Sequence, residues 1–253
     1  MNDAYAKNLT STKQTNAEKA FCDSEFWKIL GDDVHVAASA EKIAAWKNLA
    51  PKCSGSGLYE SRLMGLMTSA GQIDDARRAG INALKQPLES TKEVFVALAQ
   101  VELHADNFGL ATSYAQRAVE ADRQWFGGYT ALGEVYLSEG KYTESVDALE
   151  AALDRRAGAD VAASLSIAYR EAHRYQDSVS AMQTALKGDM RTLRYTKAVA
   201  AAAYSLVQIG EVPAARDLLA KHAKLVPAAK EDPYFLHSVK VVADAMKAAK
   251  AKE

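Results

Sequence analysis

Residues 126–160, FGGYTALGEVYLSEGKYTESVDALEAALDRRAGAD, contain two short amphipathic segments with a glycine between them. Gly140, the residue between the segments, can adopt the left-handed backbone conformation in which many helices end. On both sides of Gly140, residues suited to helix packing recur three or four positions apart, which places them on one face of a helix. Some have large apolar or aromatic side chains and others are small. They are Tyr129, Leu132, Gly133, Tyr136, Ser145, Leu149 and Ala152. The stretch therefore predicts a helical hairpin.

The same pattern recurs along the chain with a period close to 34 residues. A small residue near the start of each second helix marks it, at Ala76, Ala111, Ser145, Ser178 and Ala215. Successive marks lie about 35, 34, 33 and 37 residues apart. Five residues before each mark we expect the turn, at Gly71, Asp106, Gly140, His173 and Gly210. Recurrence of this kind predicts a stack of helical hairpins in which each packs on its neighbours.

In period and in signature residues, residues 57–227 resemble about five repeats of the tetratricopeptide-repeat family. Thirteen residues before each mark lies a packing residue, and a small residue follows it in four of the five repeats. The packing residues are Leu63, Leu98, Leu132, Leu165 and Ala202. The family's closing proline is largely missing, since only Pro227 stands at its position. The resemblance implies an all-α fold, a right-handed α-α superhelical solenoid of tetratricopeptide-like helix hairpins with a C-terminal capping helix.

The chain outside the repeats divides into three further parts. Residues 1–15 are polar and are expected to form a disordered leader. Residues 16–56 predict an N-terminal helical hairpin or degenerate repeat, with one helix over 16–30 and a second beginning at Asp32 and Asp33. Residues 57–230 form the repeat solenoid, in which 187–194 are an insertion. Residues 231–253 predict a capping helix and tail, with Asp232 as N-cap and one apolar stripe. The stripe consists of Phe235, Val239, Val242 and Met246.

The two cysteines, Cys22 and Cys53, leave two alternatives open. They are either two free buried thiols or a disulfide, and a disulfide would indicate an oxidising compartment such as a periplasm. Two full antiparallel helices over 16–30 and 33–50 would hold the cysteines on the order of 15 Å apart, too far for a bridge. The bridge becomes possible if the chain folds back after Pro51 or if the second helix starts near Ser39.

Composition argues against several classes of function. The formal net charge of -1 lacks the basic excess typical of nucleic-acid binders, so no nucleic acid is expected. No apolar run approaches the roughly 20 residues of a membrane-spanning helix, and the N-terminus lacks the apolar core of a signal peptide. The localisation is therefore left as either cytoplasmic or periplasmic.

We find no catalytic or metal-binding pattern. The five histidines lie in different segments, and neither CxxC nor HExxH occurs. We therefore expect no metal, no cofactor and no enzymatic activity. Five tyrosines could be imagined as a stacking platform for bases, but their spacing favours packing within the repeats. They are Tyr129, Tyr136, Tyr142, Tyr169 and Tyr175.

The resemblance implies that the first helices of the repeats line a concave groove that binds a peptide or a partner helix. The candidate groove residues are Ser61, Gly65, Thr68, Val96, Gln100, Leu103, Thr130, Glu134, Leu137, Ala163, Ile167, Arg170, Ala200, Tyr204 and Val207. Glu134 would repel a carboxylate, which argues against the clamp that some members use for acidic C-termini. The leading hypothesis is a non-catalytic scaffold that serves in the assembly of a larger bacterial-type complex. The alternative is a self-associating structural subunit, a homo-oligomer that docks through the N-terminal hairpin or the C-terminal helix.

Overall fold

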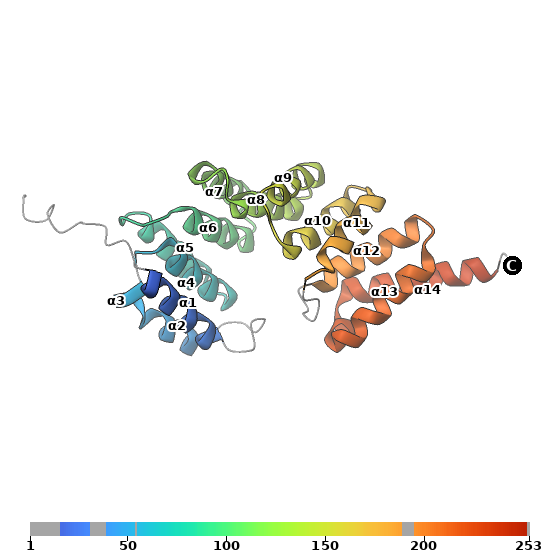
Figure 1. Cartoon of the computed structure of the whole chain (residues 1–253), viewed down its shortest axis with the longest axis horizontal. Coiled ribbons are helices and arrows are strands. Elements are labelled where there is room, and N and C mark those ends of the chain that lie inside the picture. Colours follow the sequence, from blue (N-terminus) through green and yellow to red (C-terminus); the bar gives the residue numbers. More distant parts are fainter. Residues whose placement is uncertain (1–15, 31–38, 54, 189–194, 252–253) are drawn as a thin grey trace, which may run out of the picture. The chain divides into compact units, whose positions relative to one another are not determined.

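The computed structural model describes residues 16–30, 39–53, 55–188 and 195–251. Within these ranges the regular structure is helical and contains no strand (Figure 1). The expected leader over residues 1–15, the expected helix start at Asp32 and Asp33, and residues 189–194 of the insertion lie outside the described residues. The elements are α1 (Asn16–Leu30), α2 (Ala40–Lys47), α3 (Ala50–Cys53), α4 (Gly57–Ser69), α5 (Ile73–Ala83), α6 (Lys92–His104), α7 (Phe108–Ala121), α8 (Phe126–Glu139), α9 (Tyr142–Asp154), α10 (Ala159–Glu171), α11 (Tyr175–Ala185), α12 (Thr196–Gln208), α13 (Val212–Leu225), the 3₁₀ helix η3 (Pro227–Glu231) and α14 (Pro233–Lys250).

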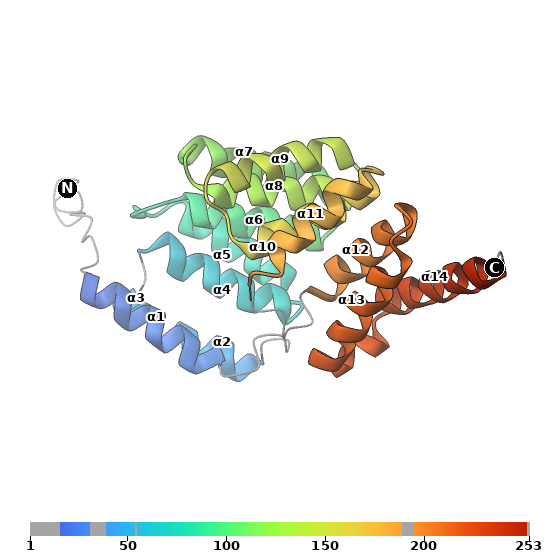
Figure 2. The same ribbon diagram turned by 45° about the vertical axis from the view of Figure 1, so that its right-hand side comes forward.

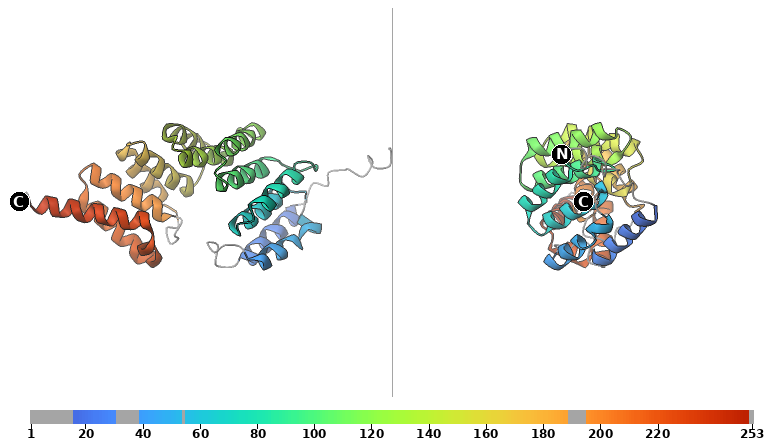
Figure 3. Two further views of the ribbon diagram at one scale, coloured as in Figure 1. Left: turned by 180° about the vertical axis from the view of Figure 1, so that it is seen from behind. Right: turned by 90° about the vertical axis from the view of Figure 1, so that its left-hand side faces the viewer.

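The chain forms two compact units, and their boundary lies inside α8. Unit 1 extends through Ala131 and unit 2 begins at Leu132. In unit 1, α4 packs on α5 and α6, and α6 packs on α7 (Figure 3). In unit 2, α10 packs on α9, α11 and α12. The boundaries expected from the sequence, near residues 15, 56 and 230, stay predictions.

The small residues that mark the repeats lie at the centre of each hairpin. Ala76, Ala111, Ser145, Ser178 and Ala215 are all completely buried. In two repeats the hydroxyl of this residue also bonds across the hairpin, from Ser145 Oγ to the Gly133 carbonyl and from Ser178 Oγ to the Ser166 carbonyl, both 2.8 Å. A Cβ on Gly133 would lie 2.5 Å from Leu149 Cγ. Small side chains are therefore required where the paired helices cross.

All five expected turns have the same backbone geometry. Gly71, Asp106, Gly140, His173 and Gly210 have positive φ angles of 74°, 56°, 81°, 60° and 85°. In each turn the next amide donates to a carbonyl five residues earlier, as in a Schellman motif. These bonds run from Gln72 to Met67, Asn107 to Glu102, Lys141 to Tyr136, Arg174 to Tyr169 and Glu211 to Leu206, at 2.8–2.9 Å. The turn positions read from the period are thus confirmed, including the two that are not glycine.

The N-terminal segment packs on the first repeat through aromatic side chains. Helix α2 begins at Ala40, after Ser39 accepts a hydrogen bond from the Lys42 amide at 3.2 Å. Its Trp46 is completely buried and its ring stacks on Tyr59 of α4 at a centroid distance of 4.9 Å. Phe26 of α1 meets Trp46 edge-on at 5.1 Å. Helices α1 to α3 therefore share the apolar core of unit 1.

The last helices of unit 2 lie side by side (Figure 2). Helix α14 begins as expected, with the Asp232 carboxylate accepting from the Phe235 amide at 3.0 Å. It packs on α12, where Ser238 Oγ donates to the Ala200 carbonyl at 2.9 Å, and on α13. Two members of its expected apolar stripe, Phe235 and Val242, are buried, whereas Val239 is 40% exposed. The stripe is therefore only partly covered.

Candidate functional site

The first helices of unit 2 carry a partly exposed face on α10 and α12, which are in contact. Ile167 and Val207 pack against the unit's core and stay partly accessible. Arg170 follows Ile167 by one turn on α10, and Tyr204 precedes Val207 by one turn on α12. The Arg170 guanidinium carbon lies 5.7 Å from the centre of the Tyr204 ring, within the range of a cation–π contact. We call Ile167, Arg170, Tyr204 and Val207 the α10–α12 face.

Arg170 is held in place without all of its donors being used. One terminal nitrogen lies 2.5 Å from Glu171 Oε1. Its Nε is buried and has no hydrogen-bond partner among the described residues. A buried donor without a partner is costly in a native structure. A ligand does not reach this buried nitrogen, but the Arg170 side chain as a whole is 24% exposed.

Tyr175 joins this face, although the sequence assigned it to repeat packing. Its ring centre lies 6.2 Å from that of Tyr204, and its hydroxyl lies 2.8 Å from His173 Nδ1. Of the five tyrosines expected to pack within repeats, Tyr169 alone is buried, and Tyr142 is exposed. The packing assignment is therefore wrong for Tyr142. The position of Tyr175 could have indicated this contact. It is the first residue of α11, two residues after the turn at His173, and α11 packs on α12, the first helix of the next repeat.

The candidate residues on α8 are divided between the two units. Glu134 and Leu137 belong to unit 2 and are partly buried. Thr130 belongs to unit 1, and its hydroxyl donates to the Phe126 carbonyl of its own helix at 3.1 Å. Each of these three side chains keeps some accessible surface.

Helix α6 of unit 1 carries a second set of candidates. Val96 and Leu103 are partly buried and Gln100 is exposed. Their spacing of four and three residues places them on one face of the helix. We call Val96, Gln100 and Leu103 the α6 face.

Three groove candidates are wrong because their side chains are buried. Thr68 donates to the Met64 carbonyl at 2.8 Å inside its own helix. Ala163 belongs to the core of unit 2. Ala200 is 3% exposed, and α14 covers its carbonyl through Ser238. In α4, Gly65 remains exposed, and Ser61 bonds to the Leu58 carbonyl.

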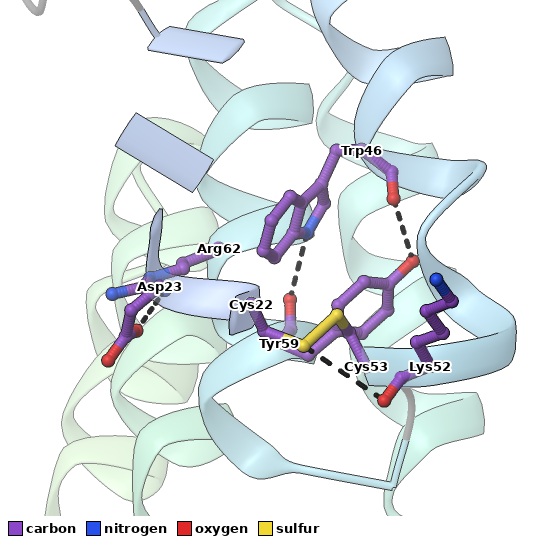
Figure 4. Close-up of a disulfide and its surroundings, with 7 residues drawn as sticks. All are labelled: Cys22, Asp23, Trp46, Lys52, Cys53, Tyr59 and Arg62. Carbon is purple, nitrogen blue, oxygen red and sulfur yellow. Dashed lines mark hydrogen bonds and ion pairs between the residues drawn. A yellow bond between two sulfur atoms is a disulfide. The ribbon is translucent and has the colours of Figure 1, made fainter. Parts of the chain in front are cut away.

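Cys22 and Cys53 form a disulfide with a Cα–Cα distance of 5.9 Å (Figure 4). Both conditions named for the bridge are met, because α2 starts after Ser39 and the short helix α3 returns the chain toward α1. Beside the bridge, Trp46 Nε1 donates to the Tyr59 carbonyl and the Tyr59 hydroxyl donates to the Trp46 carbonyl, both at 3.2 Å. Burial raises the pKa of Tyr59 to about 12. The bridge is therefore part of a packed structural core.

A cavity of about 350 Å³ adjoins the disulfide. Its two cationic side chains already have acidic partners. Arg62 pairs with Asp23 at 2.6 Å, and Lys92 pairs with Asp122 at 2.7 Å. In the described parts of the chain there is no group of three potential metal ligands, and no helix is long and apolar enough to cross a membrane.

Comparisons with known proteins bear on the fold. The sequence matches no family model, and no curated protein sequence is similar to it. Among solved structures, YrrB, described as a TPR protein with an unusual peptide-binding site, is 14% identical with a TM-score of 0.53, and the match covers 78% of this chain and 99% of that one. A thermophilic TPR protein of Thermus thermophilus is 18% identical with a TM-score of 0.56, over 75% and 98% of the two chains. Yeast Tom70 is 12% identical with a TM-score of 0.67, over 90% of this chain and 47% of its own.

The repeat geometry and the structural matches agree. The buried small residues, the five left-handed turns and the all-helical hairpins recur at the period of the tetratricopeptide repeat. Identities of this size support a shared fold and nothing finer. The chain has the tetratricopeptide-repeat fold.

Proposed function

We propose that this chain is a non-catalytic scaffold that binds a protein partner through the first helices of its repeats, as a subunit of a larger assembly. The observation that carries the proposal is the α10–α12 face. It combines partly accessible apolar side chains, Ile167 and Val207, with a cation held over an aromatic ring. Apolar anchors beside a few directional polar groups are what recognition of a short segment requires.

The partner that fits this face is an extended or helical segment with apolar residues at its centre. Tyrosine and arginine are enriched among residues that dominate binding energies, because they bury large areas and also form directed polar contacts. The partly exposed guanidinium of Arg170 favours a backbone carbonyl or side-chain oxygen next to the apolar anchors. YrrB has a peptide-binding site by its description, and the same mode is proposed for this chain.

The test is co-purification of partners from cells that naturally contain the protein, followed by mass spectrometry. Leu137→Glu, Ile167→Glu and Tyr204→Ser should each lose the partner that the unchanged chain retains, because a charge or a truncation disrupts an apolar contact. Gln183→Glu on α11, an exposed position on a second helix, is the matched control and should retain it. Circular dichroism should show an unchanged helix signal in each variant used. If Ile167→Glu and Tyr204→Ser capture the same partners as the control, the α10–α12 face is not the binding site, and the same result for Leu137→Glu excludes this part of α8.

The alternative is a self-associating structural subunit. Its support is the exposed aromatic surface of α1, where Trp27 is 55% exposed and Phe21 is 38% exposed. Sedimentation of the unchanged chain and of Trp27→Ser distinguishes this alternative. A chain that stays monomeric at high concentration refutes it.

We also infer an oxidising compartment such as a periplasm, because buried structural disulfides persist in such compartments. The mass of the protein isolated from its cells and alkylated without reductant should show two unmodified cysteines. Alkylation at both Cys22 and Cys53 without reductant would contradict the inference.

A further inference from the structure

Helices α13 and α14 enclose an open apolar groove at the end of unit 2. Its volume is about 490 Å³, and its floor is formed by the buried side chains Leu219, Phe235 and Val242. Leu236 and Val239 line it from α14 and remain 51% and 40% exposed. Exposed apolar side chains over an apolar floor are typical of a surface that another chain covers.

The preceding repeat shows what such a groove accommodates. There, α13 packs on α12, and its Ala215 and Leu219 share a core with Val179 and Met182 of α11. The second helix of this repeat thus packs along the first helix of its own repeat. By the same geometry, α13 and α14 form a packing site for one more helix. No described residue of the chain occupies this site.

Charge specifies the occupant further. Arg216 and Lys230 line the groove itself, and Arg216 also pairs with Asp217 on the surface at 2.8 Å. Lys240 and Lys247 follow Leu236 and Ala243 by one helical turn, so they lie on the same side of α14 as its exposed apolar row; Lys247 also pairs with Asp244 at 3.7 Å. Over residues 212–251 there are seven lysines and arginines and four acidic residues, a net charge of +3 by subtraction. A helix with acidic side chains beside its apolar stripe is complementary to this rim.

We propose that the α13–α14 groove binds an amphipathic helix of a partner protein, apolar on the inserted face and acidic on both flanks. This site is separate from the α10–α12 face, and it binds by helix insertion at the end of the repeat stack. Helix α9 of a second copy does not meet the requirement: it is rich in acidic residues, but its apolar residues Val146, Ala148 and Leu149 are buried in its own unit.

The probe is a synthetic helical peptide built on the insertion pattern of α13. It carries alanine or leucine at the spacing of Ala215, Leu219 and His222, and glutamate at the flanking positions. The matched control peptide has lysine at every glutamate. Binding of each labelled peptide to the full chain is measured by fluorescence anisotropy at low and at physiological salt. The acidic peptide should bind at least about tenfold more tightly than the lysine peptide, and the difference should shrink as salt rises.

Three variants of the protein test the assignment to this groove. Leu236→Glu should weaken the acidic peptide by about tenfold or more, because it places a carboxylate on the apolar row. The double variant Lys240→Glu/Lys247→Glu should reverse the preference between the two peptides. Leu236, Lys240 and Lys247 are exposed, so these changes leave the core of unit 2 intact. Ile167→Glu, which tests the α10–α12 face, should leave peptide binding unchanged, so the two proposals fail independently.

Two results would overturn the proposal. One is equal binding of the acidic and lysine peptides, or binding that Leu236→Glu does not weaken. The other is self-association of the chain that Leu236→Glu abolishes, because a second copy would then be the occupant.

Discussion

Replacing Arg77 by methionine should strongly destabilise unit 1. The Glu102 side chain is 1% exposed and accepts from Arg77 Nε at 2.5 Å and from a terminal nitrogen of Arg77 at 3.1 Å. Asn107 supplies a third hydrogen bond at 2.9 Å. Hydrogen bonding from Arg77 is the main cause that lowers the pKa of Glu102 despite its burial. The carboxylate is therefore charged in the folded protein and depends on Arg77.

The loss of stability depends on which member of the ion pair, Arg77 or Glu102, remains without its partner. Breaking a buried ion pair by removing one partner costs about 3–5 kcal/mol. The Arg77 side chain is 27% exposed, so water can reach part of the vacated space, and we expect about 3 kcal/mol, the lower end of that range. Glu102→Met should cost about 1 kcal/mol, because Arg77 keeps Asp74 as a surface partner at 2.6 Å.

The double variant Arg77→Met/Glu102→Met should cost less than Arg77→Met alone. Other repeats hold Met67 and Leu206 at the position of Glu102, nine residues before the buried small residue, so an apolar side chain fits there. Replacing both members of a buried pair by apolar residues is often neutral or stabilising. We therefore expect a coupling energy of about 2–3 kcal/mol between the two sites.

Urea unfolding followed by tryptophan fluorescence measures these changes in unit 1. All three tryptophans, Trp27, Trp46 and Trp125, precede Leu132. The slope of the free energy against urea must stay constant for the midpoints to be compared. Additive effects of the two single changes, or an Arg77→Met effect below about 0.5 kcal/mol, would refute the reasoning.

Two further predictions concern a turn and a buried histidine. Asp106 has a φ of 56°, so Asp106→Gly should stabilise unit 1 by about 0.5–1 kcal/mol, whereas Asp106→Val should destabilise it. The urea midpoint detected by fluorescence measures both changes. Equal midpoints for the two variants would contradict the argument from backbone strain. Burial lowers the pKa of His222 below its usual 6.5, so below about pH 6.5 the unfolded chain binds more protons and the folded state loses stability as the pH falls. His222 lies 3.0 Å from Thr196 Oγ1, and His222→Gln should flatten this loss in thermal unfolding followed by circular dichroism; an unchanged pH dependence would exclude His222 as its source.

The repeat architecture was predictable because it depends on local spacing. Turn positions could be counted from the buried small residues, and the register of the repeats imposes the left-handed turn even on Asp106 and His173. The cost of a positive φ at these two residues is smaller than the cost of shifting a whole helix against its neighbours. A period alone therefore located features that single-residue preferences would have missed.

Features that depend on pairing across the chain were not predictable. Glu102 stands where Tyr136 and Tyr169 stand in later repeats, and nothing local indicates that Arg77, in the preceding repeat, is its partner. The disulfide depends on where α2 starts and where α3 turns. A shift of a few residues at either point would move the Cα atoms of Cys22 and Cys53 too far apart for a bond. The apolar stripe of α14 was visible in the sequence, but not how much of it a neighbour covers.

The Cys22–Cys53 bridge also determines how the chain carries mechanical load. Tension applied at the N-terminus reaches Cys22 and crosses the disulfide to Cys53, so the residues between them bear none of it. The cysteines are 31 positions apart. About 100 Å of extended chain therefore cannot be pulled out by a force applied at this end. An unfolding machine that grips the N-terminus would thus meet the first repeat almost immediately, with α2 still folded on top of it.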